Sequence, residues 1–333
     1  MSPVAPRAAQ PAPPIEQRLD GSRQPRHYLS VADLSAGEIE ALLEDALRLK
    51  HDRAADASRN KKRLPGRTAA LVFQKPSLRT RVSFEMAMLD LGGQALYLSP
   101  AEIQLGQREG VVDAARVLSR YVDLIVARVY LHSDVVGLAR HATIPVINAL
   151  SDLEHPCQIL ADLLTLRERF GRLRGLRLAY VGDGNNVANS LALAAPRVGM
   201  QLAFGCPPGY EPDPGENMLD QAQAEGSIEV LNDPRQAVRG ANAVYTDAWY
   251  SMGQEGEAEL RRPVFGAYQL NADLLAQAAP GAVAMHCLPA HRGQEITDDV
   301  LDGPASVAYE QAENRLHAQK ALLLKLLGGQ LSR

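Results

Sequence analysis

Residues 73–88 read F-Q-K-P-S-L-R-T-R-V-S-F-E-M-A-M and join an expected strand to an expected helix. The residues before them, T-A-A-L-V-F from Thr68, are typical of a buried strand, and Lys75-Pro76 ends that pattern. The apolar residues from Val82 to Leu89 suit a packed helix, with Ser77 as its N-cap. A strand that passes directly into a helix is the repeating unit of an α/β fold.

Two arginines, Arg79 and Arg81, fall in the first turn of this helix. The N-terminus of a helix already carries about half a positive charge, so cations there are unfavourable unless an anion binds. The alternative interpretation is a pair of solvated arginines at a helix end. The stretch favours an anion site, and above all a phosphate site.

Outward from this stretch, strand-like and helix-like segments alternate along the chain, which predicts parallel α/β layers. Two consecutive sets of strands predict two doubly wound parallel-sheet domains with an active-site cleft between them. A helix at 156–169 is expected to join the domains, and a last helix at 312–327 is expected to return to the first domain. The expected strands are 69–73, 94–98, 123–128, 144–149, 176–181, 200–204, 227–231, 243–246 and 282–286, with a helix at 111–118 among those between them.

The composition is that of a soluble globular protein, with 333 residues, 22% charged and 46% hydrophobic. Its net charge of -4 and its dispersed lysines and arginines give no reason to expect a nucleic-acid partner. Apolar runs are too short for a membrane span. The three cysteines, Cys157, Cys206 and Cys287, lack C-x-x-C spacing, so neither a disulfide framework nor a zinc site is expected, and a reducing cytoplasm is the default.

The first 26 residues are rich in proline and alanine and are expected to form a flexible tail. They lack the apolar centre of a signal peptide, and their prolines would interrupt an amphipathic targeting helix. Organelle targeting is the lesser alternative.

Ligands in parallel sheets bind beyond the carboxyl ends of strands, so polar residues there are the candidates. G-D-G-N-N-V from Gly182 resembles the start of a dinucleotide fingerprint, but Val187 occupies the third glycine position and the next strand ends without a carboxylate. NAD binding is therefore disfavoured. Asn185 and Asn186 can instead bind a small polar ligand, although a simple Gly-Asn turn explains them equally well.

The sequence H-P-C-Q at 155–158 begins the expected connecting helix. His155 and Gln158 lie one turn apart and point the same way, so both can donate to a carbonyl group. A histidine at a helix start is more often structural. Arg128 favours the functional interpretation, because an arginine that ends an apolar strand is costly to bury unpaired.

Two further strands are followed by residues that could bind a substrate or react with it. Asp247, in T-D-A-W-Y-S-M-G, can bind the ammonium group of a ligand, over which the Ser-Met-Gly turn could close. The alternative is that Asp247 is the first residue of an ordinary turn and that Trp249 is simply packed. Cys287, in M-H-C-L-P-A-H-R, is either a nucleophile or an inert buried cysteine. Together the motifs predict an anion site on the first domain and an amino-acid site on the second.

The chain carries these motifs in this order: S-L-R-T-R, H-P-C-Q, D-G-N-N, D-A-W-Y-S-M-G, H-C-L-P and E-N-R. With these motifs the chain resembles the aspartate and ornithine carbamoyltransferase family, and most specifically its ornithine enzymes. The resemblance runs from about His27 to Leu327. It implies transfer of a carbamoyl group from carbamoyl phosphate to the side-chain amine of L-ornithine, giving L-citrulline and phosphate without metal or cofactor. It also implies a cytoplasmic homotrimer or an assembly of trimers. Residues 27–155 with 312–327 would bind carbamoyl phosphate, and 156–311 would bind ornithine.

The resemblance also implies a role for individual residues. Those expected to hold the phosphate and the carbamoyl group are Ser77, Leu78, Arg79, Thr80, Arg128, His155, Gln158, Cys287, Leu288 and Arg315. Those expected to hold the amino-acid end of ornithine are Asn186, Asp247, Ser251 and Met252. Arg128, His155 and Cys287 would be catalytic. Leu78 departs from the family, which more often has threonine there, and a contact through its backbone N–H should tolerate the change.

Three other functions remain open on the sequence. The acceptor amine could be aspartate, putrescine or an acylated ornithine, although the aspartate enzymes have a proline where this chain has Cys287. The chain could be an amino-acid sensor without catalysis, against which the intact S-L-R-T-R, Arg128 and His155 argue. An NAD-dependent oxidoreductase is disfavoured by Val187.

Overall fold

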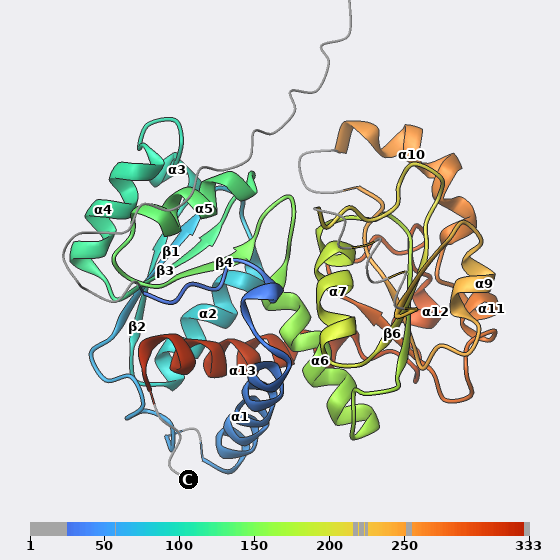
Figure 1. Ribbon diagram of the computed structural model, residues 1–333, viewed down its shortest axis with the longest axis horizontal. Coiled ribbons are helices and arrows are strands. Elements are labelled where there is room, and N and C mark those ends of the chain that lie inside the picture. The colour runs from blue at the N-terminus through green and yellow to red at the C-terminus, as the bar shows by residue number, and fades with distance from the viewer. Residues whose placement is uncertain are drawn as a thin grey trace, which may run out of the picture.

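The computed structural model describes residues 25–56, 58–215, 219, 223, 226–250 and 255–329. They form two α/β lobes that lie side by side, each built on a parallel sheet covered by helices (Figure 1). The strands of the first lobe are β1 (Thr68–Phe73), β2 (Gln94–Leu98), β3 (Leu124–Arg128) and β4 (Val146–Leu150). Its helices are η1 (Val31–Asp33), α1 (Ala36–Ala55), α2 (Leu78–Asp90), α3 (Pro100–Ile103), α4 (Val111–Tyr121) and α5 (His132–His141).

The second lobe follows the same plan. Its strands are β5 (Arg177–Val181), β6 (Gln201–Gly205), β7 (Ile228–Leu231), β8 (Ala243–Thr246) and β9 (Val283–His286). The described helices are α7 (Asn186–Arg197), α9 (Pro234–Val238), η2 (Glu255–Glu257), α10 (Ala258–Phe265), η3 (Gly266–Tyr268), α11 (Ala272–Leu275) and α12 (Asp298–Leu301). Each strand predicted from the sequence is present in one of the two sheets, so the predicted fold class is confirmed.

The strand orders place the functional loops. The first sheet runs β2-β1-β3-β4 and the second β7-β6-β5-β8-β9. In each sheet the chain first adds strands on one side of its first strand and then crosses to the other side, which opens a crevice at the carboxyl ends of β1 and β3, and of β5 and β8. Ser77, Asn186 and Asp247 follow β1, β5 and β8, and Arg128 ends β3. His155 follows β4 and Cys287 follows β9, at the same ends of the two sheets.

Two helices connect the lobes. Helix α6 (Pro156–Phe170) lies between them, and α13 (Ala308–Leu327) packs against α1, α2 and α6 (Figure 1). Lys320 of α13 is fully buried, and its Nζ lies 3.0 Å from Asp90 Oδ2 at the end of α2. This buried ion pair anchors the last helix on the first lobe. The sequence predicts that this helix returns to the first lobe, but not the ion pair.

Helix α13 begins at Ala308, four residues before the expected start at 312. Its first turn contacts β9 of the second lobe, where Ala308 and Gln311 are buried. Amphipathic periodicity missed this turn because its burial depends on another lobe.

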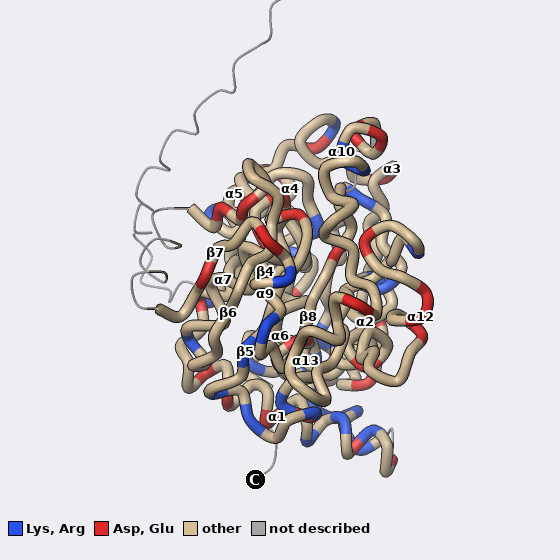
Figure 2. Tube along the Cα trace, turned by 90° about the vertical axis from the view of Figure 1, so that its right-hand side faces the viewer, with Lys and Arg blue, Asp and Glu red and all other residues tan. Residues whose placement is uncertain are grey.

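At the amino end, residues 1–24 of the expected tail lie outside the described residues. Arg26 Nη2 donates to Glu38 Oε2 at 2.9 Å, so Arg26, the last residue of the expected tail, contacts the first lobe. In the described part of the chain, no helix is both long and apolar enough to cross a membrane. Figure 2 shows basic and acidic residues interspersed along the trace, with both on α1.

Candidate active site

A cavity of about 390 Å³ lies where the carboxyl ends of the two sheets face each other. Most of the site residues expected from the sequence line it, namely Ser77, Leu78, Arg79, Thr80, Arg128, His155, Asn186, Asp247, Cys287, Leu288 and Arg315. Gln158 does not line the cavity, because its side chain is buried behind Arg315 and accepts a hydrogen bond from Arg315 Nη1 at 2.8 Å. Ser251 and Met252 lie outside the described residues.

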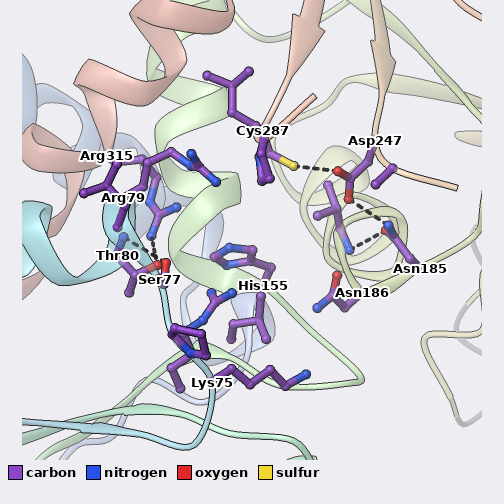
Figure 3. Close-up of a pocket in the computed structure, with 18 of the residues that line it drawn as sticks. Lys75, Ser77, Arg79, Thr80, His155, Asn185, Asn186, Asp247, Cys287 and Arg315 are labelled. Carbon is purple, nitrogen blue, oxygen red and sulfur yellow. Dashed lines mark hydrogen bonds between the residues drawn. The ribbon is translucent and has the colours of Figure 1, made fainter. Parts of the chain in front are cut away.

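Cations dominate one side of the cavity. Arg79 comes from the first turn of α2 and Arg315 from α13 (Figure 3). Arg128 comes from the end of β3 and lines the same cavity. Arg128 and Arg315 are only 5% and 2% exposed, and across the described residues none of the three is ion-paired with a carboxylate. Burial, followed by the charges of Arg315 and Arg79, lowers the pKa of Arg128 to about 10. Such a cluster is costly unless an anion binds to it.

The anion would meet a helix N-terminus as well as the arginines. Ser77 caps α2, and its hydroxyl accepts from the Thr80 N–H at 3.3 Å. Arg128 Nε is buried without a hydrogen-bond partner within the described structure. The backbone N–H groups of the first turn and the free donor of Arg128 are suited to phosphate oxygens.

Arg81 is not part of this cluster. Its Nε donates to Glu85 Oε1 at 2.9 Å, and its guanidinium carbon lies 3.9 Å from the centroid of the Tyr97 ring. The inference that both arginines of S-L-R-T-R need an anion is therefore wrong for Arg81. The spacing of Arg81 and Glu85, four residues apart on one helix, was the available signal for the ion pair, whereas the contact with Tyr97 on β2 depends on packing.

His155 lies at the amino end of α6, between the two halves of the cavity (Figure 3). Burial, followed by the charges of Arg315, Arg128 and Arg79, holds its pKa well below the usual 6.5. The ring is therefore neutral near pH 7, with one nitrogen that donates and one that accepts. Its Nδ1 is buried without a partner among the described residues, which leaves it available to a ligand.

The second lobe supplies the opposite side. Asp247 Oδ2 accepts from Asn185 Nδ2 at 2.7 Å, and Asp247 Oδ1 accepts from the Cys287 thiol at 3.0 Å (Figure 3). Asn186 Nδ2 donates to the carbonyl of Ser151 at 2.7 Å, which joins the two lobes beside the cavity. A carboxylate at this position provides a binding site for an ammonium group.

Cys287 is a neutral thiol in this setting. Burial raises its pKa well above the usual 9.0, and the charge of Asp247 and the hydrogen bond to it raise it further. Thiolates and not thiols are nucleophiles, so this environment does not favour covalent catalysis. The next residue, Leu288, has a φ of 57°, which is uncommon for a residue with a side chain.

The sequence analysis gave no site role to three polar residues of the cavity wall, Lys75, Tyr250 and His291, and it named Asn185 only as a general polar candidate beside Asn186. Lys75 Nζ lies 4.7 Å from the centroid of the Tyr130 ring. The rings of Tyr250 and His291 stack with centroids 5.2 Å apart. Each of these residues lies within or next to a motif identified above. That proximity was the sequence signal that could have marked them as residues of the cavity wall.

One group of side chains has the spacing of a metal site. The ligand atoms of Asp247, His286 and Cys287 all lie within 4.8 Å of one another. Both ring nitrogens of His286 are already used, because Nε2 contacts Glu295 Oε1 at 3.1 Å and Nδ1 accepts from the Leu288 N–H at 2.8 Å. Metal binding would also require the thiolate that this site disfavours. The expectation that no metal is needed stays a prediction.

Comparison with known proteins adds an independent line of evidence. A family model described as the carbamoyl-P binding domain of aspartate/ornithine carbamoyltransferase matches residues 26–168. The model described as the Asp/Orn binding domain of the same family matches residues 174–326.

Individual relatives match over nearly their whole length. The ornithine carbamoyltransferase of Methanoculleus marisnigri is 50% identical over 305 residues, which cover 91% of this chain and 97% of the relative. The solved ornithine carbamoyltransferase of Pyrococcus furiosus is 51% identical with a TM-score of 0.86, covering 92% of this chain and 99% of that one. The anabolic enzyme of Campylobacter jejuni is 37% identical with a TM-score of 0.84, covering 90% and 98%.

Replacing Arg79 tests the anion side. We expect Arg79→Ala to weaken the binding of inorganic phosphate by roughly 10- to 100-fold in calorimetry, the scale of one charge-assisted hydrogen bond. Its melting temperature should not fall, since a cation is removed from a helix N-terminus. Arg81→Ala is the matched control and should bind phosphate like the parent protein. Equal phosphate affinity in Arg79→Ala and Arg81→Ala would contradict the assignment.

The raised pKa of Cys287 predicts its reactivity. Because only the thiolate reacts, alkylation of Cys287 by iodoacetamide at about pH 7.5 should be much slower than that of free cysteine and should rise steeply above about pH 9. Asp247→Asn removes the charge that raises this pKa and should accelerate the reaction, whereas Cys157, with a pKa of about 12 from burial, should be unaffected. Peptide mass mapping measures each site. Alkylation of Cys287 near pH 7.5 at the rate of free cysteine would rule out a neutral thiol.

Proposed function

The chain belongs to the aspartate/ornithine carbamoyltransferase family, and on this premise we propose how its cleft transfers the carbamoyl group of carbamoyl phosphate to the side-chain amine of L-ornithine. The chain is a carbamoyltransferase, and the products are L-citrulline and phosphate. The observation that carries the proposal is the contrast between the two sides of one cavity. One side has three arginines that pair with no carboxylate among the described residues, and the other has the Asp247–Cys287 pair.

Carbamoyl phosphate would bind on the arginine side. Its phosphate would lie at the N-terminus of α2, on Ser77, Leu78, Arg79 and Thr80, with Arg315 beside it. The carbonyl oxygen gains negative charge as the amine adds, and Arg128, His155 and Thr80 would donate to it. A neutral His155 serves this role without adding another charge to the cluster.

Ornithine would bind on the opposite side. Its α-ammonium group would pair with Asp247, while Asn186, Ser251 and Met252 would hold the rest of the amino-acid end. Its side-chain amine would lie beside Cys287 and Leu288, facing the carbamoyl carbon. That amine has an ordinary pKa near ~10.4 by analogy with lysine, so it must lose a proton before it can attack.

The reaction then needs no covalent enzyme intermediate. The amine nitrogen forms a bond to the carbamoyl carbon, the bond from that carbon to the phosphate oxygen breaks, and the departing phosphate accepts a proton from the nitrogen. Alignment of the two substrates and exclusion of water supply most of the acceleration in such a scheme. The neutral thiol of Cys287 would position the amine and would not attack.

We also propose the division of labour and the assembly implied by the resemblance. Residues 27–155 with 312–327 would bind carbamoyl phosphate, and 156–311 would bind ornithine. Exposed apolar side chains on α2 and β2, among them Leu89 and Leu96, support association of copies into a homotrimer or an assembly of trimers. The three free cysteines suit a cytoplasmic location.

An initial-rate citrulline assay tests the function directly. With carbamoyl phosphate present, we expect turnover with ornithine and little product formation with putrescine or aspartate. Aspartate is the least favoured rival, because Cys287 stands where the aspartate enzymes have proline. Faster carbamoylation of putrescine or aspartate than of ornithine would overturn the substrate assignment, and failure of all three to react would overturn the activity.

Asp247→Asn separates ornithine from putrescine, which lacks the α-ammonium group. We expect kcat/KM for ornithine to fall by roughly 10- to 100-fold, the cost of leaving a buried charged group unpaired, with a much smaller loss for putrescine. Asp183→Asn is a matched control, because this carboxylate follows β5 but faces Arg261, with 3.1 Å between Oδ2 and Nη1. Its ornithine-to-putrescine ratio should not change. Equal losses for both amines in Asp247→Asn would refute the specificity argument.

A further inference from the structure

A buried carboxylate behind the cavity has no role in the mechanism above. Asp162 lies on α6, one turn after Gln158, and is fully buried. Burial raises its pKa to about 6, although hydrogen bonds from Gln311 and Gln158 and the nearby Tyr245 hydroxyl oppose this shift. No ion pair within the described structure compensates its charge. A carboxylate in such a place is costly, so its contacts call for an explanation.

One oxygen of Asp162 holds two amides. Oδ1 accepts from Gln158 Nε2 at 2.8 Å and from Gln311 Nε2 at 2.9 Å. An ionised carboxylate can only accept hydrogen bonds, so each glutamine must turn its NH2 group towards Asp162 and its carbonyl oxygen away. The charge of Asp162 therefore sets the direction of both amides.

The first amide leads to the anion side. Gln158 Oε1 accepts from Arg315 Nη1 at 2.8 Å, and Arg315 Nη2 donates to Thr80 Oγ1 at 3.3 Å. If the amide were reversed, its NH2 group would face the guanidinium, which has only donors. The orientation of Gln158 thus determines where Arg315 is held.

The second amide leads to the amine side. Gln311 Oε1 accepts from the backbone N–H of His286 at 2.9 Å, at the end of β9. The ring of His286 then accepts from the Leu288 N–H, which holds Leu288 in its left-handed conformation beside Cys287. This path ends at the residues that would face the reacting amine.

We propose that Asp162 is a positioning residue for carbamoyl transfer, whose carboxylate orients Gln158 and Gln311 and so holds Arg315 and the Cys287–Leu288 segment in register across the cleft. This inference rests on the proposed function, which explains why Arg315 and the Cys287–Leu288 segment must be held in fixed positions across the cleft. Asp162 touches neither substrate in this scheme. It acts through the two glutamines, which come from the two helices that join the lobes.

If Asp162 only held α6 and α13 together, other polar contacts between these two helices would have the same role. One turn further along α6, Thr165 Oγ1 accepts from Asn314 Nδ2 of α13 at 2.9 Å. Thr165 is buried like Asp162 and joins the same two helices. Within the described structure, the hydrogen bonds of Thr165 and Asn314 lead to Ala161, Lys50 and Glu168, which do not line the cavity. Thr165→Val is therefore the matched control for loss of helix packing.

The experiment compares Asp162→Asn with Thr165→Val. An asparagine keeps the shape but can donate as well as accept, so the amides are no longer forced into one direction. We expect Asp162→Asn to weaken inorganic phosphate binding in calorimetry and to lower kcat/KM for ornithine, each by about tenfold, the scale of one hydrogen bond to a charged group. Thr165→Val should leave both within about twofold even where its melting temperature falls.

A double-mutant cycle separates the two paths. Gln311→Leu cuts only the amine path, so it should raise KM for ornithine and leave phosphate affinity unchanged. In that background Asp162→Asn should still weaken phosphate binding but add little to the ornithine defect, because coupled residues are not additive. Should Asp162→Asn fail to fold, Gln158→Leu and Gln311→Leu carry the test, the first expected to act on phosphate alone and the second on ornithine alone.

Parent-like phosphate affinity and kinetics in Asp162→Asn would overturn the proposal, as would equal losses in Thr165→Val or simple additivity in the cycle. These results differ from a failure of the proposed function. Absence of citrulline formation by the parent protein would refute the function, whereas phosphate binding by the variants reports on the path through Gln158 without any turnover.

Discussion

Uncompensated positive charge at the meeting point of the two sheets is the constraint on which the rest of this structure depends. Arg79, Arg128 and Arg315 converge there from three separate elements, and two of them are almost completely buried. Folding must therefore offset their mutual repulsion and lost hydration with packing elsewhere, until an anion supplies the missing charge. A polyanionic substrate such as carbamoyl phosphate satisfies this requirement, and the same charges then stabilise the oxyanion that forms during transfer.

The helices that join the lobes also supply the chemistry. Helix α6 carries His155 at its first turn and Gln158 and Asp162 behind it, while α13 carries Gln311 and Arg315. Small changes in how these helices pack would therefore move groups on both sides of the cavity together. The buried Lys320–Asp90 pair at the other end of α13 fixes this helix on the first lobe.

Two protonation states follow from burial and simplify the mechanism. Burial, to which the charges of the neighbouring arginines add, keeps His155 neutral, and burial beside the carboxylate of Asp247 keeps Cys287 a neutral thiol. A neutral imidazole can donate to the carbonyl oxygen, and a neutral thiol leaves the attack to the substrate amine. In the proposed mechanism the site would therefore work by orientation and fixed charge, without an acyl-enzyme.

Local patterns in the sequence are enough to predict the strands, the helices and much of the cavity wall. Strands such as β1 and helix caps such as Ser77 are local patterns, and in a parallel sheet the residues after the strands meet at one edge, which places Asp247 and Cys287 near each other. Arg128 belongs to the other sheet, so its place opposite them depends on how the two lobes pack. Packing in three dimensions determined the contacts that join distant segments. It set the guanidinium of Arg81 against the ring of Tyr97, moved Gln158 behind Arg315, and extended α13 back to Ala308. It also gave Asp162 its two amides, one from its own helix and one 149 residues away. Hydrogen bonds and burial between distant segments depend on packing in three dimensions, and no local pattern of residues encodes them.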